Sequence, residues 1–307
     1  MTTSTQRAVQ TTSSIDELSF NNQAVSLCML VNRRHKTVRV IDFRAGATLA
    51  KRNFVINTAR KEGIEKVFVL VERDEVNTWG RLGFRREGSI PGFYRRSDAW
   101  IMGAVVAEVG PMRPERAWDD EDDDDLEVEP ESPRQAIADK HVERAKKLAK
   151  ELLDKPLPQT KLAPAKRDVL HKAILAAQKS GRALTGFEAF SRDAERHHVT
   201  LTGKGGFELH ASYELQPSFA STMLELLSAP RDEAERLLTL SALRTVLGKM
   251  VEAGAVSSFS LAPASDHQLG ACFVVAGFRR SALLASHLEV GGERHDAILW
   301  SKKLVDN

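Results

Sequence analysis

The chain has 307 residues, of which 42% are hydrophobic and 28% are charged, and its formal net charge at pH 7 is +2. This length predicts two domains of ordinary size, and the near-balanced charge gives no reason to expect a nucleic acid or an anionic membrane as partner. No apolar run is long enough to span a bilayer, and the polar N-terminus has no apolar signal segment. Cys28 and Cys272 lie far apart in apolar runs, which favours buried free thiols over a disulfide. A cytoplasmic protein is expected.

The first 20 residues are polar and rich in Ser and Thr, which predicts a flexible tail. Residues 21–110 are interpreted as the N-terminal domain. Its expected elements are the strand Val38–Phe43, the helix Gly46–Lys61, the strand Lys66–Val71, the helix Asp74–Leu82 and the strands Arg85–Ile90 and Ala99–Met102. The strand Lys66–Val71 is predicted to be buried because its apolar character is continuous.

Residues 111–133 contain a dense run of Asp and Glu. Like charges repel and resist burial, so this run predicts a disordered linker. An acidic docking or metal-binding strip is the alternative, although no ligand spacing accompanies the run.

Residues 134–307 are interpreted as the C-terminal domain. It opens with two predicted helices, Arg134–Leu153 and Ala165–Lys179, separated by a Pro-rich stretch. The expected elements that follow are the hairpin His198–Thr202 and Phe207–Leu215, the strand Thr222–Leu227, the helix Asp232–Ala253, the strand Ser258–Leu261, the helix Ser265–Ala276 and the strands Ala282–Val290 and Ala297–Trp300.

The two domains repeat the same order of elements and share short motifs. Gly-Phe-Arg-Arg occurs at residues 83–86 and 277–280, and Asp-Ala opens the last strand at 98–99 and 296–297. The order predicts, in each domain, a mixed and mostly antiparallel sheet with one parallel pair joined by a crossover helix. The expected fold class is therefore α/β (α+β), with helices flanking the sheets.

This order resembles that of the acetyl-CoA-dependent GNAT acyltransferases, and it is most similar to the β-lysine N-acetyltransferases, in which a partial unit precedes a complete one. Residues 82–94 resemble the family's segment that follows Gly-Phe, and residues 98–102 resemble the strand after it. In the C-terminal domain, residues 262–265 resemble a family turn and residues 296–304 the family's ending. The resemblance covers about residues 24–106 and 198–304, and it implies tandem GNAT-like units.

The resemblance implies a cofactor, acetyl-CoA, and a set of site residues. Glu225 falls where the family has an aspartate, so it would be the catalytic base. The strand at 224–228 and the loop at 231–236 would hold the cofactor, with the diphosphate at the N-terminus of the following helix. The implied cofactor-binding residues are Leu226, Leu227, Ser228, Arg231, Ala234, Arg236 and Ser265.

The sequence departs from the family pattern in several places. Ala234 and Arg236 occupy the glycine positions of the diphosphate loop, and Arg44-Ala45-Gly46-Ala47 in the first domain has only one glycine. Phe273, which has no proton to give, stands where the family has a tyrosine. Three carboxylates, those of Asp232, Glu233 and Glu235, would suit the helix dipole but repel a diphosphate.

Each implied residue also has an ordinary structural interpretation. Glu225 would be a solvent-facing strand residue, residues 226–228 would belong to the core, Arg236 would be solvated, and Ser265 would cap a helix. His197 and His198 match no metal-ligand spacing, so no metal is expected.

Two functional hypotheses remain. The first is transfer of an acetyl group from acetyl-CoA to a primary amine of a small amino acid such as β-lysine. The second is a degenerate GNAT-like pair that serves as a regulatory or protein-binding module.

Overall fold

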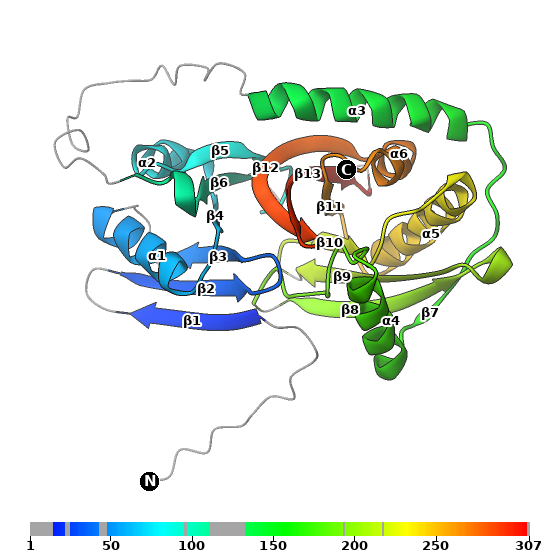
Figure 1. Cartoon of the computed structure of the whole chain (residues 1–307), viewed down its shortest axis with the longest axis horizontal. Coiled ribbons are helices and arrows are strands. Elements are labelled where there is room, and N and C mark those ends of the chain that lie inside the picture. Colours follow the sequence, from blue (N-terminus) through cyan, green and yellow to red (C-terminus); the bar gives the residue numbers. More distant parts are fainter. Residues whose placement is uncertain are drawn as a thin grey trace, which may run out of the picture.

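A computed structural model describes residues 15–21, 25–42, 48–94, 97–110, 133–192, 194–216 and 218–305. All thirteen strands assigned in these residues belong to one sheet, in the order β1-β2-β3-β4-β6-β5-β12-β13-β11-β10-β9-β8-β7 (Figure 1). Strands β1–β6 come from the N-terminal half, residues 15–110, and β7–β13 come from the C-terminal half, residues 133–305.

The N-terminal half contains β1 (Ile15–Asn21), β2 (Ser26–Asn32), β3 (Thr37–Asp42), α1 (Leu49–Lys61), β4 (Lys66–Val71), α2 (Val76–Arg81), β5 (Arg85–Ile90) and β6 (Ala99–Val105). The C-terminal half contains α3 (Pro133–Leu152), β7 (Lys161–Pro164), α4 (Arg167–Lys179), β8 (Glu195–Thr202), β9 (Glu208–Gln216), β10 (Ser221–Leu226), α5 (Glu233–Glu252), β11 (Ser257–Pro263), α6 (His267–Val275), β12 (Arg279–Val290) and β13 (Glu293–Lys303).

The internal repeat predicted from the sequence is confirmed. The order β3–α1–β4–α2–β5–β6 recurs as β10–α5–β11–α6–β12–β13. Each half has one parallel pair, β3 with β4 and β10 with β11, and the other neighbouring strands in the described residues run antiparallel. The fold is therefore a mixed α/β structure with a large, mostly antiparallel sheet flanked by helices.

The two halves meet at β5 and β12, which run antiparallel with Gly88 opposite Ala282. Gly88 has φ = +138°, and a Cβ added there would lie 2.4 Å from the Cβ of Ala282, so a side chain is excluded by both backbone and space. Beside this junction the ammonium of Lys66 donates to the carboxylate of Glu87, and both side chains are almost fully buried. Glu87 also accepts from the backbone N–H of Ala285 at 3.0 Å, which ties the two halves together.

Alternation along the strands gives the sheet two different faces. On one face, α1 and α2 cover the apolar side chains of the N-terminal half, and α5 and α6 cover those of the C-terminal half. On the other face, which we call the inner face, Phe68 and Ile101 of the first half share a cluster with Met223, Phe259 and Leu299 of the second. The inner faces of the two halves therefore pack against each other.

Three strands were not expected from the sequence. The structure places Ile15–Asn21 in β1, so the predicted tail over residues 1–20 is wrong for its last six residues, while residues 1–14 lie outside the described part. Strand β2 had no predicted counterpart, and β7 forms inside the Pro-rich stretch. Proline is tolerated in β7 because this strand is at the edge of the sheet, and Pro164 is its last residue.

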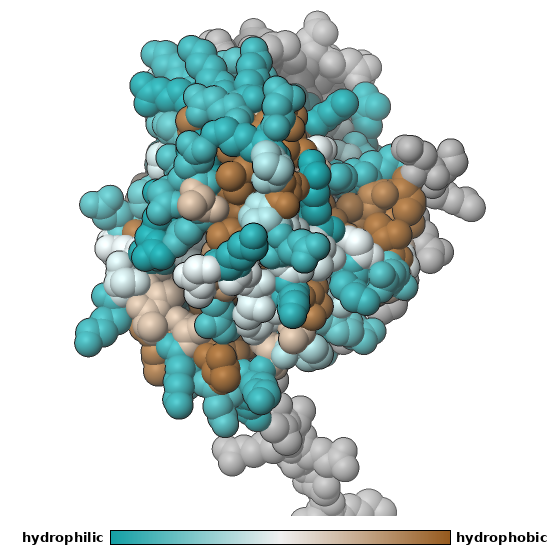
Figure 2. Space-filling model, turned by 90° about the vertical axis from the view of Figure 1, so that its right-hand side faces the viewer, coloured by the Kyte–Doolittle hydropathy of each residue, from teal (hydrophilic) through white to brown (hydrophobic). Residues whose placement is uncertain are grey.

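The predicted linker at 111–133 and the Arg44–Ala47 loop lie outside the described residues, apart from Pro133, which begins α3. The two cysteines are free and buried, as predicted. No helix in the described residues is long and apolar enough to cross a membrane. The face formed by the right-hand side of Figure 1 mixes hydrophilic side chains with smaller hydrophobic groups (Figure 2).

Candidate functional site

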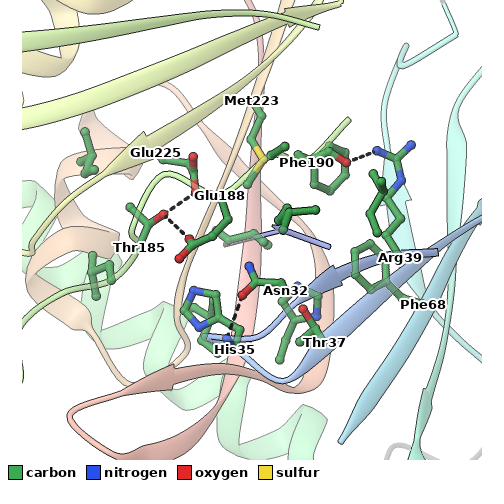
Figure 3. A pocket seen from close by; sticks show the side chains of 18 residues that line it. Asn32, His35, Thr37, Arg39, Phe68, Thr185, Glu188, Phe190, Met223 and Glu225 are labelled. Carbon is green, nitrogen blue, oxygen red and sulfur yellow. Dashed lines mark hydrogen bonds between the residues drawn. The ribbon is translucent and has the colours of Figure 1, made fainter. Parts of the chain in front are cut away.

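A small cavity of about 70 Å³ lies between the inner faces of the two halves. The N-terminal half contributes Asn32, His35, Thr37, Arg39 and Phe68, and the C-terminal half contributes Met223, Glu225 and His287 together with the loop between α4 and β8 (Figure 3). The wall is unusual for a protein interior because several of its side chains carry titratable groups.

Glu225 is the acidic side chain that β10 presents to this cavity. Leu224 and Leu226 on either side of it belong to the core beneath α5, so the alternation of the strand directs Glu225 to the inner face. The hydroxyls of Thr185 and Ser212 lie 2.7 Å and 3.2 Å from its two carboxyl oxygens. Burial, and to a lesser extent the charge of Glu188, raise the pKa of Glu225 to about 8.

Thr185 links Glu225 to a second buried carboxyl group. Its hydroxyl lies 3.2 Å from Oε2 of Glu188 and accepts from the N–H of Phe187 at 2.7 Å. A hydroxyl has one proton and two lone pairs, so it can donate to one carboxylate only and must accept from the other group. Since burial raises the pKa of Glu225 to about 8, a protonated Glu225 can donate to the hydroxyl of Thr185, which leaves the hydroxyl proton free to be donated to Glu188.

The loop that carries Glu188 is held by a buried ion pair. The carboxylate of Glu214 accepts from the backbone N–H groups of Phe190 at 2.9 Å and Ser191 at 2.7 Å, and from the guanidinium of Arg196 at 2.6 Å. Strands β8 and β9 thus fix the loop backbone, and with it the separation of the two carboxyl groups.

The N-terminal half supplies the opposite wall, where Arg39 is the main cation. Its guanidinium donates to the carbonyl of Phe190 at 2.5 Å and to the hydroxyl of Ser191 at 2.9 Å, and burial lowers its pKa to about 10. Burial also lowers the pKa of His35 to about 4, so this imidazole is neutral at pH 7, and its Nδ1 accepts from the N–H of Glu289 at 3.0 Å. Arg39 therefore gives this wall its positive charge.

A larger cleft, of about 530 Å³, opens where β10 and β11 diverge. The two strands pair only over residues 221–223 and 257–259, and their remaining residues separate. Leu184 borders both this cleft and the smaller cavity, and its N–H donates to the carbonyl of Leu227 at 2.9 Å. One side chain therefore lies between the two spaces.

The first turn of α5 is already supplied with anionic groups. Asp232 caps the helix by accepting from the N–H of Glu235 at 2.9 Å, as expected for an aspartate at this position. Glu235 in turn accepts from the backbone N–H of Arg231 at 2.8 Å and from its side chain. A carboxylate of the chain itself thus occupies the place where the sequence predicts a diphosphate.

The structure brings some predicted site residues together and separates others. Ser228, Arg231 and Ala234 line a neighbouring pocket of about 390 Å³ at the start of α5, and Arg231 also lines the cleft. Leu226 borders the cavity together with Glu225. The interpretation of Glu225 as a solvent-facing residue is wrong, because its side chain is partly buried, lines the cavity and is hydrogen-bonded to Thr185 and Ser212.

Three other expectations need correction. Arg236 is 7% exposed, so it is not solvated, and it lines none of these pockets because it lies beneath α6. Leu227 packs among α4 residues, and its carbonyl is bonded to Leu184 rather than left open. Ser265 lines the cleft but does not cap α6; the cap is Asp266, which accepts from the N–H of Leu269 at 2.9 Å.

Sequence reasoning missed Thr185, Glu188 and Arg39. The first two lie in a loop with no recognisable motif, and Arg39 was hidden in an apolar strand. Its position between two buried valines, Val38 and Val40, was the available signal, because it places a cation on the opposite face of β3. The described residues contain no group of three or more side chains suited to a metal ion.

No protein-family model matches the chain, and no curated protein matches it. Among solved structures, a ribosomal-protein-S18-alanine N-acetyltransferase from Escherichia coli is 15% identical over 48% of this chain and 96% of its own, with a TM-score of 0.37. A dodecameric spermidine N-acetyltransferase from Vibrio cholerae is 10% identical over 48% of this chain and 94% of its own, with a TM-score of 0.39.

Proposed function

We propose that this chain is a GNAT-like N-acetyltransferase that transfers an acetyl group from acetyl-CoA to the primary amine of a small amino acid such as β-lysine. The observation that carries the proposal is Glu225, a carboxyl group with a raised pKa in a small cavity that shares its lining residue Leu184 with a larger cleft. The proposal requires that the acceptor occupy the cavity and that the acyl donor occupy the cleft.

The cavity has the chemistry that an amino acid needs. Glu188 and Glu225 lie on one side, where they suit an amine, and Arg39 lies on the other, where it suits a carboxylate. An amine must lose a proton before it attacks a carbonyl group. A carboxyl group with a pKa of about 8 is close to ambient pH, so Glu225 in its ionised form is suited to hold that proton.

The cleft contains groups that fit acetyl-CoA. The Oε1 of Gln268 and the Nδ1 of His267 are buried at the start of α6 and have no hydrogen-bond partner in the described residues. They suit the polar groups of an amide-bearing arm. Arg182 and Arg231, which line both the cleft and the adjacent pocket, would hold the diphosphate, and Glu235 would then have to release Arg231. When bound, acetyl-CoA supplies an acetyl thioester.

The degenerate-pair hypothesis is the second candidate, and the contact between Glu235 and Arg231 favours it. A carboxylate that already satisfies the donors of the diphosphate loop weakens the case for a cofactor. Phe273, at the position of the family's tyrosine, is fully buried, so it offers neither a proton nor access. In this reading the chain would bind a protein partner instead.

Binding of acetyl-CoA separates the two candidates. Wild-type protein is titrated by calorimetry, and its thermal unfolding is followed with saturating cofactor. A ligand at 100 times its dissociation constant stabilises the folded state by about 2.7 kcal/mol. If about 1 mM acetyl-CoA produced neither a heat of binding nor a rise in the unfolding temperature, the acetyltransferase hypothesis would be refuted and the degenerate-pair hypothesis would remain.

Transfer itself is measured with labelled acetyl-CoA and a panel of amino acids and polyamines. Glu225→Gln keeps the shape of the side chain but cannot take up a proton, so kcat should fall by about 100-fold or more while acetyl-CoA affinity is retained. Glu151→Gln, on the exposed side of α3, is the matched control and should be unaffected. Unchanged turnover in Glu225→Gln would remove this residue from the reaction.

A further inference from the structure

A second pocket, of about 640 Å³, lies at the opposite end of β11 from the cleft. It is formed where Ser257 opens β11, where β12 begins and where β13 ends, and the loop after β5 adds Pro91 and Gly92. Both halves of the chain therefore contribute to it, and its residues take no part in the proposed acetyl transfer.

The lining of this pocket is strongly basic. Arg279, Arg280, Lys302 and Lys303 line it, and no Asp or Glu is among its described lining residues. Arg280 is neutralised by an ion pair with Asp139 of α3. Arg279 and Lys303 are exposed and make no ion pair within the described part of the chain. An uncompensated positive charge thus faces a concave surface.

A buried hydroxyl group and a partly buried ammonium add polar groups to the wall of this pocket. The hydroxyl of Ser257 is buried in the wall and has no hydrogen-bond partner in the described residues. Lys302 donates to the carbonyl of Ala276, and burial, with a smaller effect of the charge of Arg244, lowers its pKa. An acceptor with negative charge would satisfy the hydroxyl and offset the cations together.

Only part of the basic character is shared with the N-terminal copy of the repeat. The Asp-Ala motifs align β6 with β13, so that Ala104 and Val105 stand at the positions of Lys302 and Lys303. The N-terminal half therefore has apolar residues where the C-terminal half has two lysines. The two arginines of Gly-Phe-Arg-Arg are common to both halves, with Arg85 corresponding to Arg279 and Arg86 to Arg280.

We propose that this pocket binds a small molecule bearing a phosphate group, with Arg279, Lys303 and the hydroxyl of Ser257 as its ligands. Arginine and lysine form charge-assisted hydrogen bonds to phosphate oxygens, and a serine hydroxyl adds a neutral one. The volume is in the range of pockets that hold small-molecule ligands.

The test uses full-length protein and two probes, inorganic phosphate and ribose 5-phosphate, titrated by calorimetry at constant ionic strength maintained with chloride. Wild type should bind at least one probe saturably below about 10 mM. The double variant Arg279→Ala/Lys303→Ala should bind it at least about tenfold more weakly. Ser257→Ala should weaken binding by about three- to tenfold, which general charge screening would not do.

Two controls locate the anion. Arg85→Ala removes the equivalent arginine of the N-terminal repeat and should leave affinity unchanged. Arg231→Ala should also leave it unchanged, since that residue belongs to the cleft. Loss of binding in Arg231→Ala but not in the double variant would place the anion in the cofactor cleft and overturn the proposal.

The proposal is also overturned if neither probe binds saturably, or if the double variant binds like wild type. A single-stranded oligonucleotide that displaces phosphate with on the order of 100-fold higher affinity would identify a nucleic-acid surface instead. Thermal unfolding of each variant confirms folding, which is expected because Arg279 and Lys303 are exposed.

Discussion

Glu225 should make the stability of the folded chain depend on pH in a way that one substitution removes. The pKa of its carboxyl group is about 8 in the folded chain against 4.5 for the free group. The folded state thus holds the proton more tightly than the unfolded state. The stability from this group is fully present below the lower pKa and is lost as pH rises toward the higher one.

The magnitude follows from the two pKa values. Between them, each pH unit lowers the free energy of unfolding by about 1.4 kcal/mol. From about pH 5.5 to about pH 7.5 the loss is about 2.5 kcal/mol, after allowing for the titration that has occurred at each end. Glu225→Gln has no proton to lose, and its amide can still donate to Thr185, so this part of the pH dependence should disappear.

The assay is urea denaturation followed by tryptophan fluorescence at both pH values. The difference in the free energy of unfolding between wild type and Glu225→Gln should change by about 2.5 kcal/mol from the lower pH to the higher pH, and the change should favour the variant at the higher pH. The free energy of unfolding of Glu151→Gln should change between the two pH values by the same amount as that of wild type. If the free energy of unfolding of Glu225→Gln changed with pH by as much as that of wild type, the claim that burial holds this carboxyl group protonated would be refuted, whatever the activity of the chain.

The remaining predictions concern the pair of carboxyl groups and the junction of the halves. Glu188→Gln removes a charge that raises the pKa of Glu225. In urea denaturation over the same pH range, the fall in the free energy of unfolding should therefore be complete at a lower pH than in wild type. Gly103→Ala would place a Cβ 2.2 Å from Oε2 of Glu87, so calorimetry should record a loss of about 3 kcal/mol or more. Gly80→Ala, which has nothing within 4 Å in helix α2, should instead gain up to about 1 kcal/mol.

The sequence was most informative where one physical signal dominated. Strand Lys66–Val71 has the predicted bounds because a continuous apolar run can only be buried on both sides. The repeated turn at Gly83 and Gly277 was also predictable, since both residues have a φ near +85° that favours glycine. Edge strands escaped notice, because β1 is mostly exposed and so lacks apolar alternation.

The site was only partly predictable for a different reason. Glu225 was identified through the family resemblance, and the sequence alone left open whether it faces solvent or a site. Its partners Thr185 and Glu188 come from a loop whose position depends on Glu214 of another strand. No local pattern encodes such a contact, so the raised pKa and the carboxyl pair emerged only from the packed structure.

The register of the two parallel pairs explains why the halves contribute differently to the cavity. Thr37 pairs with Lys66 as Ser221 pairs with Ser257, and counting along both strands puts Ile41 at the position of Glu225. The N-terminal half thus has an aliphatic side chain where the C-terminal half has its carboxyl group, so the proposed base cannot occur twice. The same count puts Arg39 at the position of Met223, and Arg39 lines the cavity from the opposite wall. The cavity therefore has a cation from one half and a carboxyl group from the other, so in the proposed function both halves are needed to form the acceptor site.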